Sequence, residues 1–191
     1  MDQLLAQIRA CTICAEQLPL GPRPVMNAHP ESRIAIIGQA PGTKVHASGV
    51  PWDDASGKQL RQWLNVPDEQ FYDPRLFAIV PMGFCYPGKG KSGDLPPRPE
   101  CQPAWHPQLL EAMPNIELTL LIGQYAQGHY LGAAKGKNLT ETVRNFRSYL
   151  PKYLPLPHPS SRNRFWQAKN SWFKDEVLPL LQETTAMLLP A

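Results

Sequence analysis

The sequence predicts a three-layer α/β/α domain with a central, mostly parallel sheet of four strands. Short apolar runs alternate along the chain with segments whose apolar residues recur at helical spacing, which is typical of βαβ units. The runs are continuously apolar, as expected for parallel strands covered on both faces. The chain has 191 residues, so a single domain over residues 1–191 is expected, because one core can extend to roughly 250 residues.

In the first part of the chain, a short amphipathic helix is expected over residues 2–10, where leucine and isoleucine lie on one side. The apolar run 33–37 is the first strand. A helix is expected over residues 56–64, because leucines and a tryptophan stand at core spacing there. The run 76–80 is the second strand, and residues 104–113 form the next helix.

In the second part, the run 117–122 is the third strand, and it ends at a glycine that opens a helix over residues 124–131. The fourth strand, 153–156, contains a proline and is therefore expected at an edge of the sheet. Helices close the chain over residues 164–187, with a break near Asn170.

Composition limits the choice of partners only loosely. The formal net charge is +3 and the isoelectric point is near 8.7. Basic residues crowd the last third of the chain, which is a weak footprint of a polyanionic partner, and solvated helix faces explain them equally well. These residues are Arg144, Arg147, Lys152, Arg162, Arg164, Lys169 and Lys174.

Membrane association is not expected, because no apolar run approaches the roughly 18 residues of a membrane span. The first residues also lack the basic and then apolar pattern of a secretion signal. We therefore expect a soluble, cytoplasmic protein.

Two loops carry most of the functional information, because each directly follows an apolar strand. One consists of Gly38, Gln39, Ala40, Pro41 and Gly42; the other consists of His158, Pro159, Ser160, Ser161, Arg162 and Asn163. Such turns present backbone N–H groups at the carboxyl edge of a sheet, where open α/β folds bind their ligands. The first loop has neither the G-x-G-x-x-G spacing nor the Walker lysine, so it does not indicate a nucleotide cofactor.

The chain contains four cysteines, Cys11, Cys14, Cys85 and Cys101. In a cytosolic protein, a C-x-x-C pair favours a metal or redox site over a disulfide. The pair follows a helix rather than a strand, which argues against a thioredoxin motif. Four thiolates suit zinc or an iron–sulfur cluster, and the wide spacing of the second pair is commoner around a cluster. Buried structural cysteines are the alternative.

Taken together, these motifs resemble the uracil-DNA glycosylase superfamily, and specifically its iron–sulfur branch, known as family 4. The C-x-x-C pair, the glycine loop, the two later cysteines and the terminal histidine motif occur in the family's order. The resemblance implies a monomeric DNA glycosylase that hydrolyses the N-glycosidic bond of uracil or a related deaminated base. It also implies DNA as the partner and a 4Fe-4S cluster on the four cysteines, with zinc as the alternative.

The resemblance assigns roles to single residues. Trp52 would stack on the uracil, and an ordinary core aromatic is the alternative. His158 would donate a hydrogen bond to the uracil oxygen on which negative charge develops. The backbone of Gly38, Gln39, Ala40, Pro41 and Gly42 would complete the cradle for the base.

DNA contacts are implied at two places. Ser160, Ser161, Arg162 and Asn163 would form the loop that enters the minor groove and binds phosphates. Capping of the following helix by Ser161 is the alternative, and both roles can hold at once. Lys89, Lys91 and Arg98 would face the phosphate backbone, from a loop that the cluster orders.

The chain departs from the family at two points. Gln39 stands where the iron–sulfur branch has glutamate, and Ala40 stands where other branches have a polar residue. The water that attacks the sugar would then be held by Gln39 or assisted by Asp53 or Asp54. The two aspartates are also plausible helix caps. Pro81 stands where the family presents an asparagine to uracil. The backbone of Met82 and Gly83, or the Gln39 side chain, would then select the base.

These departures leave two rival interpretations. The chain could be a catalytically inactive nucleic-acid-binding member of the same fold. It could also be an iron–sulfur or zinc protein that acts on a free nucleotide or another heterocycle, because a shared architecture does not fix a function.

Overall fold

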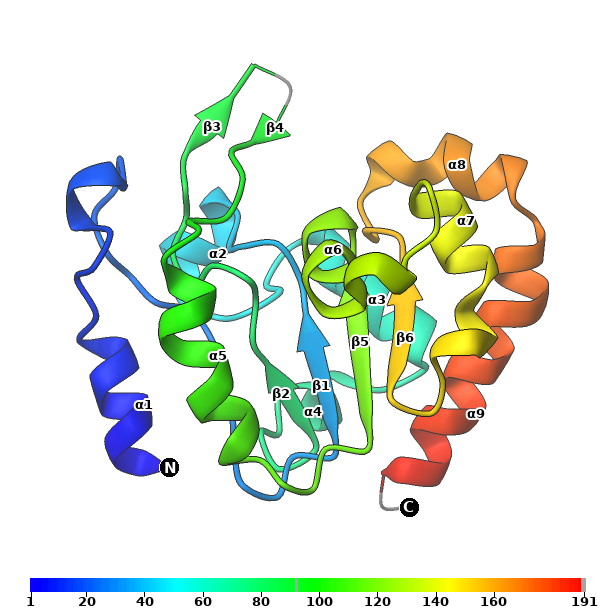
Figure 1. Ribbon diagram of the computed structural model, residues 1–191, viewed down its shortest axis with the longest axis horizontal. Coiled ribbons are helices and arrows are strands. Elements are labelled where there is room, and N and C mark those ends of the chain that lie inside the picture. Colours follow the sequence, from blue (N-terminus) through cyan, green and yellow to red (C-terminus); the bar gives the residue numbers. More distant parts are fainter. Residues whose placement is uncertain (92, 190–191) are drawn as a thin grey trace.

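A computed structural model describes residues 1–91 and 93–189 of the chain. Its centre is a four-stranded sheet in the order β2-β1-β5-β6, in which every neighbouring pair is parallel (Figure 1). The strands are β1 (Ile34–Ile37), β2 (Phe77–Ile79), β5 (Leu118–Ile122) and β6 (Tyr153–Leu156). The predicted three-layer α/β/α class is confirmed, and β6 lies at an edge, as its proline predicts.

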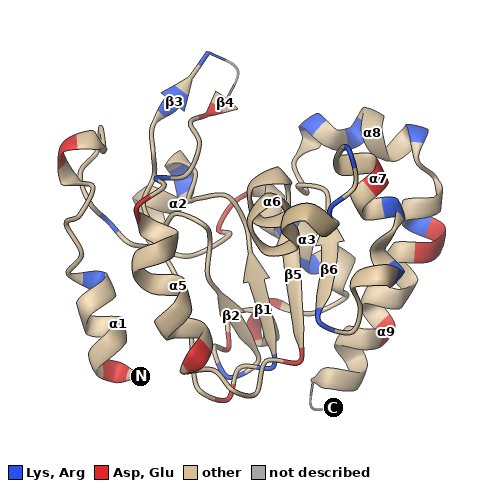
Figure 2. Cartoon of the chain, viewed as in Figure 1, with Lys and Arg blue, Asp and Glu red and all other residues tan. Residues whose placement is uncertain are grey.

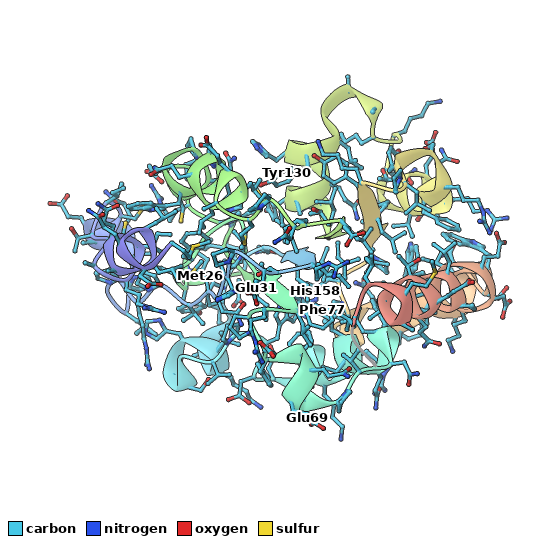
Figure 3. All side chains as sticks on the ribbon, turned by 90° about the horizontal axis from the view of Figure 1, so that it is seen from below. Met26, Glu31, Glu69, Phe77, Tyr130 and His158 are labelled. Carbon is cyan, nitrogen blue, oxygen red and sulfur yellow. The ribbon has the colours of Figure 1, made fainter. Side chains whose placement is uncertain are left out.

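Helices cover both faces of this sheet, which explains why its strands are continuously apolar (Figures 1 and 3). On one face, Ile34 and Ile36 pack with α3 (Ala55–Leu64) and α9 (Leu178–Leu188). On the other face lie α1 (Asp2–Arg9), α5 (Cys101–Glu111) and α6 (Gln124–Leu131). Successive strand residues point to opposite faces, so both layers are anchored by the same few strands.

The strand order creates a natural ligand crevice. From β1 the chain passes to β2 on one side, and it later returns to place β5 on the other side of β1. The carboxyl ends of β1 and β5 therefore flank a topological switch point, where open α/β sheets bind ligands. The loops after β1, β5 and β6 all begin at this upper rim of the sheet (Figure 1).

Several short elements differ from the sequence-based expectation. Helices α2 (Thr43–Ser48), α4 (Asp68–Phe71) and α7 (Leu139–Arg144) were not predicted, and neither was the hairpin of β3 (Lys89–Gly90) and β4 (Gly93–Asp94). The three helices are too short to show a periodic apolar stripe. A signal for α7 does exist, because Asn138 accepts from the Glu141 N–H and Lys137 N–H donates to the Glu141 carboxylate.

Element boundaries shift where prolines occur. Helix α5 begins at Cys101, three residues before the expected start, because Pro103 lies in the first turn, where no intrahelical N–H is needed. The closing segment is interrupted as predicted: α8 (Arg164–Lys169) ends before Asn170, and a π-helical turn over Phe173–Val177 leads into α9. Among the described helices, none combines the length and apolar character that crossing a membrane requires.

Candidate active site

A cleft of about 480 Å³ opens at the upper rim of the sheet. This volume is in the range of sites that enclose a small molecule. The glycine loop after β1, the start of α6 and the histidine loop after β6 all contribute to its wall. Further wall comes from the segment before α3 and from the β3–β4 hairpin. The cleft therefore gathers side chains that are far apart in the sequence.

Trp52 packs against the glycine loop, and two glycines, Gly38 in that loop and Gly57 in α3, leave room for it. A Cβ on Gly38 would stand 3.1 Å from Trp52 Cζ2, and a Cβ on Gly57 would stand 1.7 Å from the Trp52 carbonyl oxygen. Trp52 itself has a left-handed backbone with φ of 56°. Its ring centroid lies 5.6 Å from that of His158, with an angle of 33° between the planes. The two predicted base-binding residues thus share one cavity.

His158 is held in a defined tautomer. Its Nδ1 accepts a hydrogen bond from the Ser160 N–H at 3.2 Å, and its carbonyl oxygen accepts from Asn163 Nδ2 at 2.7 Å. A backbone amide only donates, so Nδ1 carries no proton and the neutral ring carries it on Nε2. Burial lowers the pKa of His158, against the opposing charges of Asp54 and Asp94, and Arg162 lowers it further. The cleft therefore contains a neutral imidazole whose Nε2–H is a donor.

Only one of the two neighbouring aspartates, Asp54, lies in the cleft. Asp54 lines the cleft, and its Oδ1 caps α3 by accepting from the Gly57 N–H at 2.8 Å. Asp53 is exposed and lies outside the residues that line the cleft. A third carboxylate, Asp94, also lines the cleft, and its Oδ2 lies 3.5 Å from the position of a Cβ on Gly42. Sequence reasoning missed Asp94 because it did not predict the hairpin that carries it.

Gln39 ties the hairpin to the glycine loop. Its Nε2 donates to the Leu95 carbonyl oxygen at 2.9 Å. On the other side, the Arg162 guanidinium packs against Gly93, where a Cβ would lie 2.6 Å from Nη1. The hairpin is therefore fixed to both loops that form the cleft.

The backbone of Met82 and Gly83 lies outside the cleft. Both residues are buried, and their N–H groups donate to the carbonyl oxygens of Gly38 and Gln39 at 2.9 and 3.0 Å. These amides join the two loops and are not available to a base. This pairing arises because the chain after β2 runs alongside the chain after β1.

Pro81 lines the cleft and is backed by a buried histidine. The Pro81 carbonyl oxygen accepts from His106 Nε2 at 3.0 Å, and His106 Nδ1 accepts from the Tyr130 hydroxyl at 2.6 Å. Burial lowers the pKa of His106 to about 4 and raises the pKa of Tyr130. Sequence reasoning missed His106, because one histidine within a helix gives no pattern.

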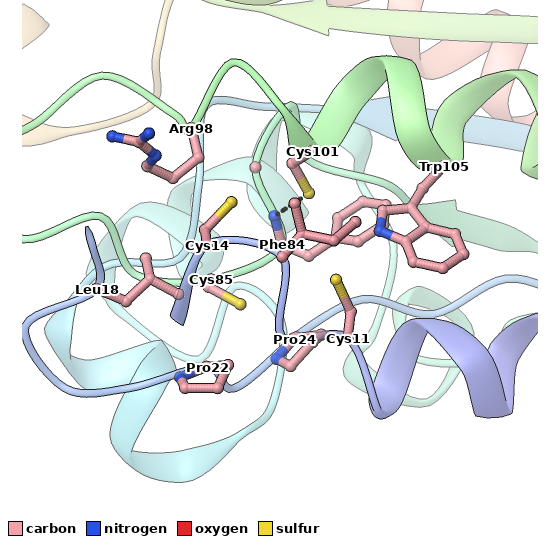
Figure 4. A pocket seen from close by; sticks show the side chains of 12 residues that line it. Cys11, Cys14, Leu18, Pro22, Pro24, Phe84, Cys85, Arg98, Cys101 and Trp105 are labelled. Carbon is pink, nitrogen blue, oxygen red and sulfur yellow. Dashed lines mark hydrogen bonds between the residues drawn. The ribbon is translucent and has the colours of Figure 1, made fainter. Parts of the chain in front are cut away.

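The four cysteines line a second pocket, between the start of α5 and the segment after α1 (Figure 4). The four thiols lie around the same pocket, whose walls are mostly apolar. The Phe84 N–H donates to Cys101 Sγ at 3.3 Å. Burial raises the pKa of Cys85 to about 11 and of Cys101 to about 12. Among the described residues, no group of three or more His, Cys, Asp or Glu side chains is arranged to hold a metal ion.

The predicted DNA-contacting residues divide into two groups. Lys89 and Lys91 are exposed on the hairpin, and Ser160 and Arg162 line the cleft. Figure 2 shows basic residues on the hairpin and around α8, on opposite sides of the upper rim. Arg98 belongs to neither side: it lines the cysteine pocket, and its Nε donates to Glu100 Oε2 at 3.1 Å.

Ser161 and Asn163 form a short 3₁₀ turn after the histidine. Ser161 is exposed and makes no side-chain cap to the described residues of that turn or of α8. Asn163 instead closes the loop onto the carbonyl of His158. The capping alternative for Ser161 is therefore not seen in the structure.

A family comparison agrees with this architecture. The model of the family described as the Uracil DNA glycosylase superfamily matches residues 26–182. The matched range includes every residue that lines the cleft except Val25, together with the hairpin, Cys85 and Cys101. It begins after Cys11 and Cys14.

Proposed function

The chain belongs to the uracil DNA glycosylase superfamily, and from that premise we propose that it hydrolyses the N-glycosidic bond of uracil, or of a related deaminated base, in DNA. The observation that carries the proposal is the pairing of Trp52 and His158 in one cleft, with their ring centroids 5.6 Å apart. An aromatic face and a neutral donor are what an extruded base needs: a stacking surface and a partner for its oxygen.

The cleft supports a dissociative hydrolysis. The flipped base stacks on Trp52, and His158 Nε2–H donates to a base oxygen. As the C1′–N bond breaks, its electron pair moves onto the base, and the sugar becomes oxocarbenium-like. The donor is already oriented by the Ser160 N–H, so its stabilisation of the leaving anion requires no reorganisation.

Asp54 is our choice for the group that assists the water. Among the described residues, the Gly57 N–H donates to Asp54 Oδ1. Asp54 Oδ2 can therefore accept a proton from the water as the water oxygen bonds to C1′. The carboxylate also lies near His158, whose pKa it raises. Gln39, which points to the hairpin carbonyl of Leu95, then has a positioning role.

Base selection depends on the groups that line the cleft near Pro81. Pro81 offers neither a side-chain amide nor an N–H, and its carbonyl oxygen is engaged by His106. No described group at Pro81 therefore distinguishes uracil from other deaminated bases. For this reason hypoxanthine and xanthine belong in the substrate test.

A cluster on the four cysteines is our proposal for the second pocket. Their thiols surround one apolar pocket, as cluster ligands do. In the same pocket the Trp105 Nε1–H is buried and has no partner among the described residues. An unpaired buried donor costs about 1–3 kcal/mol, and a group that brings sulfur acceptors would satisfy it. Four thiolates are the ligand set that a 4Fe-4S cluster requires, and such a cluster would stabilise the segment between Cys85 and Cys101 that carries the hairpin.

The test is an excision panel. Purified wild-type protein is incubated with oligonucleotides containing uracil, hypoxanthine or xanthine, each single- and double-stranded, and alkaline cleavage at abasic sites is measured. We expect excision of at least one of these bases. If the protein binds DNA but excises no base, the inactive nucleic-acid-binding interpretation is favoured. If it binds free nucleotide but not DNA, the interpretation as a metalloprotein that acts on a free nucleotide or heterocycle is favoured.

Asp54→Asn provides the matched mechanistic test. We expect its single-turnover excision rate to fall by at least about a hundredfold, whereas Asp175→Asn, an exposed aspartate away from the cleft, retains the wild-type rate. Wild-type excision by Asp54→Asn would remove Asp54 from the mechanism, and Asp53→Asn would then show whether the other aspartate contributes.

A further inference from the structure

The indole of Trp105 presents a donor that the described structure does not use. Its Nε1 is shielded from solvent and has no hydrogen-bond partner among residues 1–91 and 93–189. An indole N–H only donates, and buried donors are nearly always paired in folded proteins. The site around Trp105 is therefore built for an acceptor.

Trp105 is directed toward the cysteine pocket by its helix. It stands four residues after Cys101 on α5, so the two side chains lie on the same face of the helix. In Figure 4, the edge of the indole that carries the nitrogen faces the sulfurs of Cys101 and Cys11, and the six-membered ring points away from them. Trp105 also lines the pocket together with all four cysteines.

Two other donors at this pocket have acceptors among the described residues. The Phe84 N–H donates to Cys101 Sγ, and the Arg98 guanidinium is held by Glu100. The walls are otherwise mainly apolar side chains such as Leu18 and Pro24. Because no described residue accepts from the Trp105 Nε1–H, a group bound by the four thiols would supply an acceptor for it.

We propose that Trp105 Nε1–H donates a hydrogen bond to a sulfur of an iron–sulfur cluster bound by the four cysteines. This role rests on the cluster proposed above, and it makes Trp105 a positioning residue for that cluster. An N–H donor at a cluster sulfur stabilises the more negative, reduced state, so it raises the reduction potential. It also retains the cluster, since partners outside the ligand set commonly contribute tenfold or more to affinity.

The test compares the wild-type protein with Trp105→Phe, after anaerobic reconstitution with iron and sulfide. Absorbance near 400 nm follows loss of the cluster to a chelator, and redox titration monitored by electron paramagnetic resonance gives the midpoint potential. We expect Trp105→Phe to lose the cluster about tenfold faster and to have a more negative potential. Trp166→Phe is the matched control, because the Trp166 N–H donates to Thr140 Oγ1, away from the cysteines.

A second variant separates hydrogen bonding from packing. Trp105→benzothienylalanine keeps the bicyclic ring and replaces only the N–H by sulfur, so it should reproduce the effects of Trp105→Phe. Wild-type potential and cluster lifetime in both variants would overturn the role of Trp105. A wild-type protein that binds zinc and no iron or sulfide would overturn both the cluster and this role, and the excision panel would still test the glycosylase independently.

Discussion

His158 shows how much of the proposed chemistry depends on a single hydrogen bond. The Ser160 N–H selects its tautomer, and burial keeps the ring neutral by lowering its pKa. A neutral ring is sufficient to donate a hydrogen bond to the leaving base. It also avoids the cost of a full charge on a side chain that is partly removed from water. In the proposed mechanism, the imidazole therefore acts as an oriented donor rather than as a titrating acid.

Removal of this donor gives a direct prediction. His158→Ala should lower the single-turnover excision rate by at least about a hundredfold, the usual loss for one donor to a developing anion. His29→Ala is the matched control, because His29 precedes β1 at the opposite rim of the sheet and does not line the cleft. The prediction is wrong if His158→Ala and His29→Ala excise the base at the same rate.

His106 makes a prediction about acid stability. It is fully buried, and its pKa falls from 6.5 to about 4 in the folded protein. Below about pH 6.5 the unfolded chain therefore binds a proton at His106, whereas the folded protein binds it only at about pH 4. The free energy of unfolding should fall by about 3 kcal/mol over that interval, from this group alone.

Urea unfolding measures this effect between about pH 7.5 and pH 4. This range includes the pKa of His106 in the unfolded chain and in the folded protein. His106→Gln cannot titrate, so its unfolding free energy should depend less steeply on pH, whatever its absolute stability. Parallel pH profiles for the wild-type protein and His106→Gln would contradict the assignment. His158 contributes in the same direction, because its pKa is also lowered, and it is present in both proteins.

Among the elements, the start of α3 shapes the cleft directly. It places Asp54 as the helix cap and brings Gly57 against the carbonyl of Trp52. Gly57→Ala would put a methyl group 1.7 Å from that oxygen, so we expect a loss of about 1–3 kcal/mol in stability. Excision should fall as well, because Trp52 must move.

Gly128→Ala is the matched control for this helix change. Gly128 lies within α6, and an added Cβ there would meet no atom within 4 Å. Alanine is the better helix former by about 1 kcal/mol, so this variant should be as stable as the wild-type protein or more stable. Thermal unfolding of the two variants decides the point, and equal stability of both would contradict the steric argument.

The elements also show where sequence patterns are informative. The four strands and the longer helices were predicted because burial on one or two faces imposes a period on the residues. The β3–β4 hairpin has strands of only two residues, too short for any period. Its place is fixed by tertiary contacts, including the bond from Gln39 to Leu95.

For the molecule as a whole, the hairpin and α8 place basic residues on opposite sides of the upper rim (Figure 2). A duplex bound across the upper rim would contact both groups, and a contacted phosphate contributes to the salt dependence of binding. Lys89→Ala and Lys91→Ala should each weaken DNA binding and reduce the slope of log K against log salt by about 0.9 for a duplex.

Lys152→Ala is the control for this prediction, because Lys152 precedes β6 at the opposite rim of the sheet. It should leave both affinity and salt slope at their wild-type values. Titration of a fluorescent duplex at several salt concentrations measures both quantities. A slope that is unchanged in Lys89→Ala and Lys91→Ala would place the DNA elsewhere on the protein.

The sequence by itself determined the fold class, the four strands, and the two loops that meet at the upper rim, because these depend on local periodicity and turn chemistry. Only the tertiary structure decided which side chains share the cleft. It separated Asp54 from Asp53, moved Arg98 to the cysteine pocket, and brought in Asp94 and His106. The physical reason is that contacts between distant segments follow from strand order and helix packing, which no local pattern encodes.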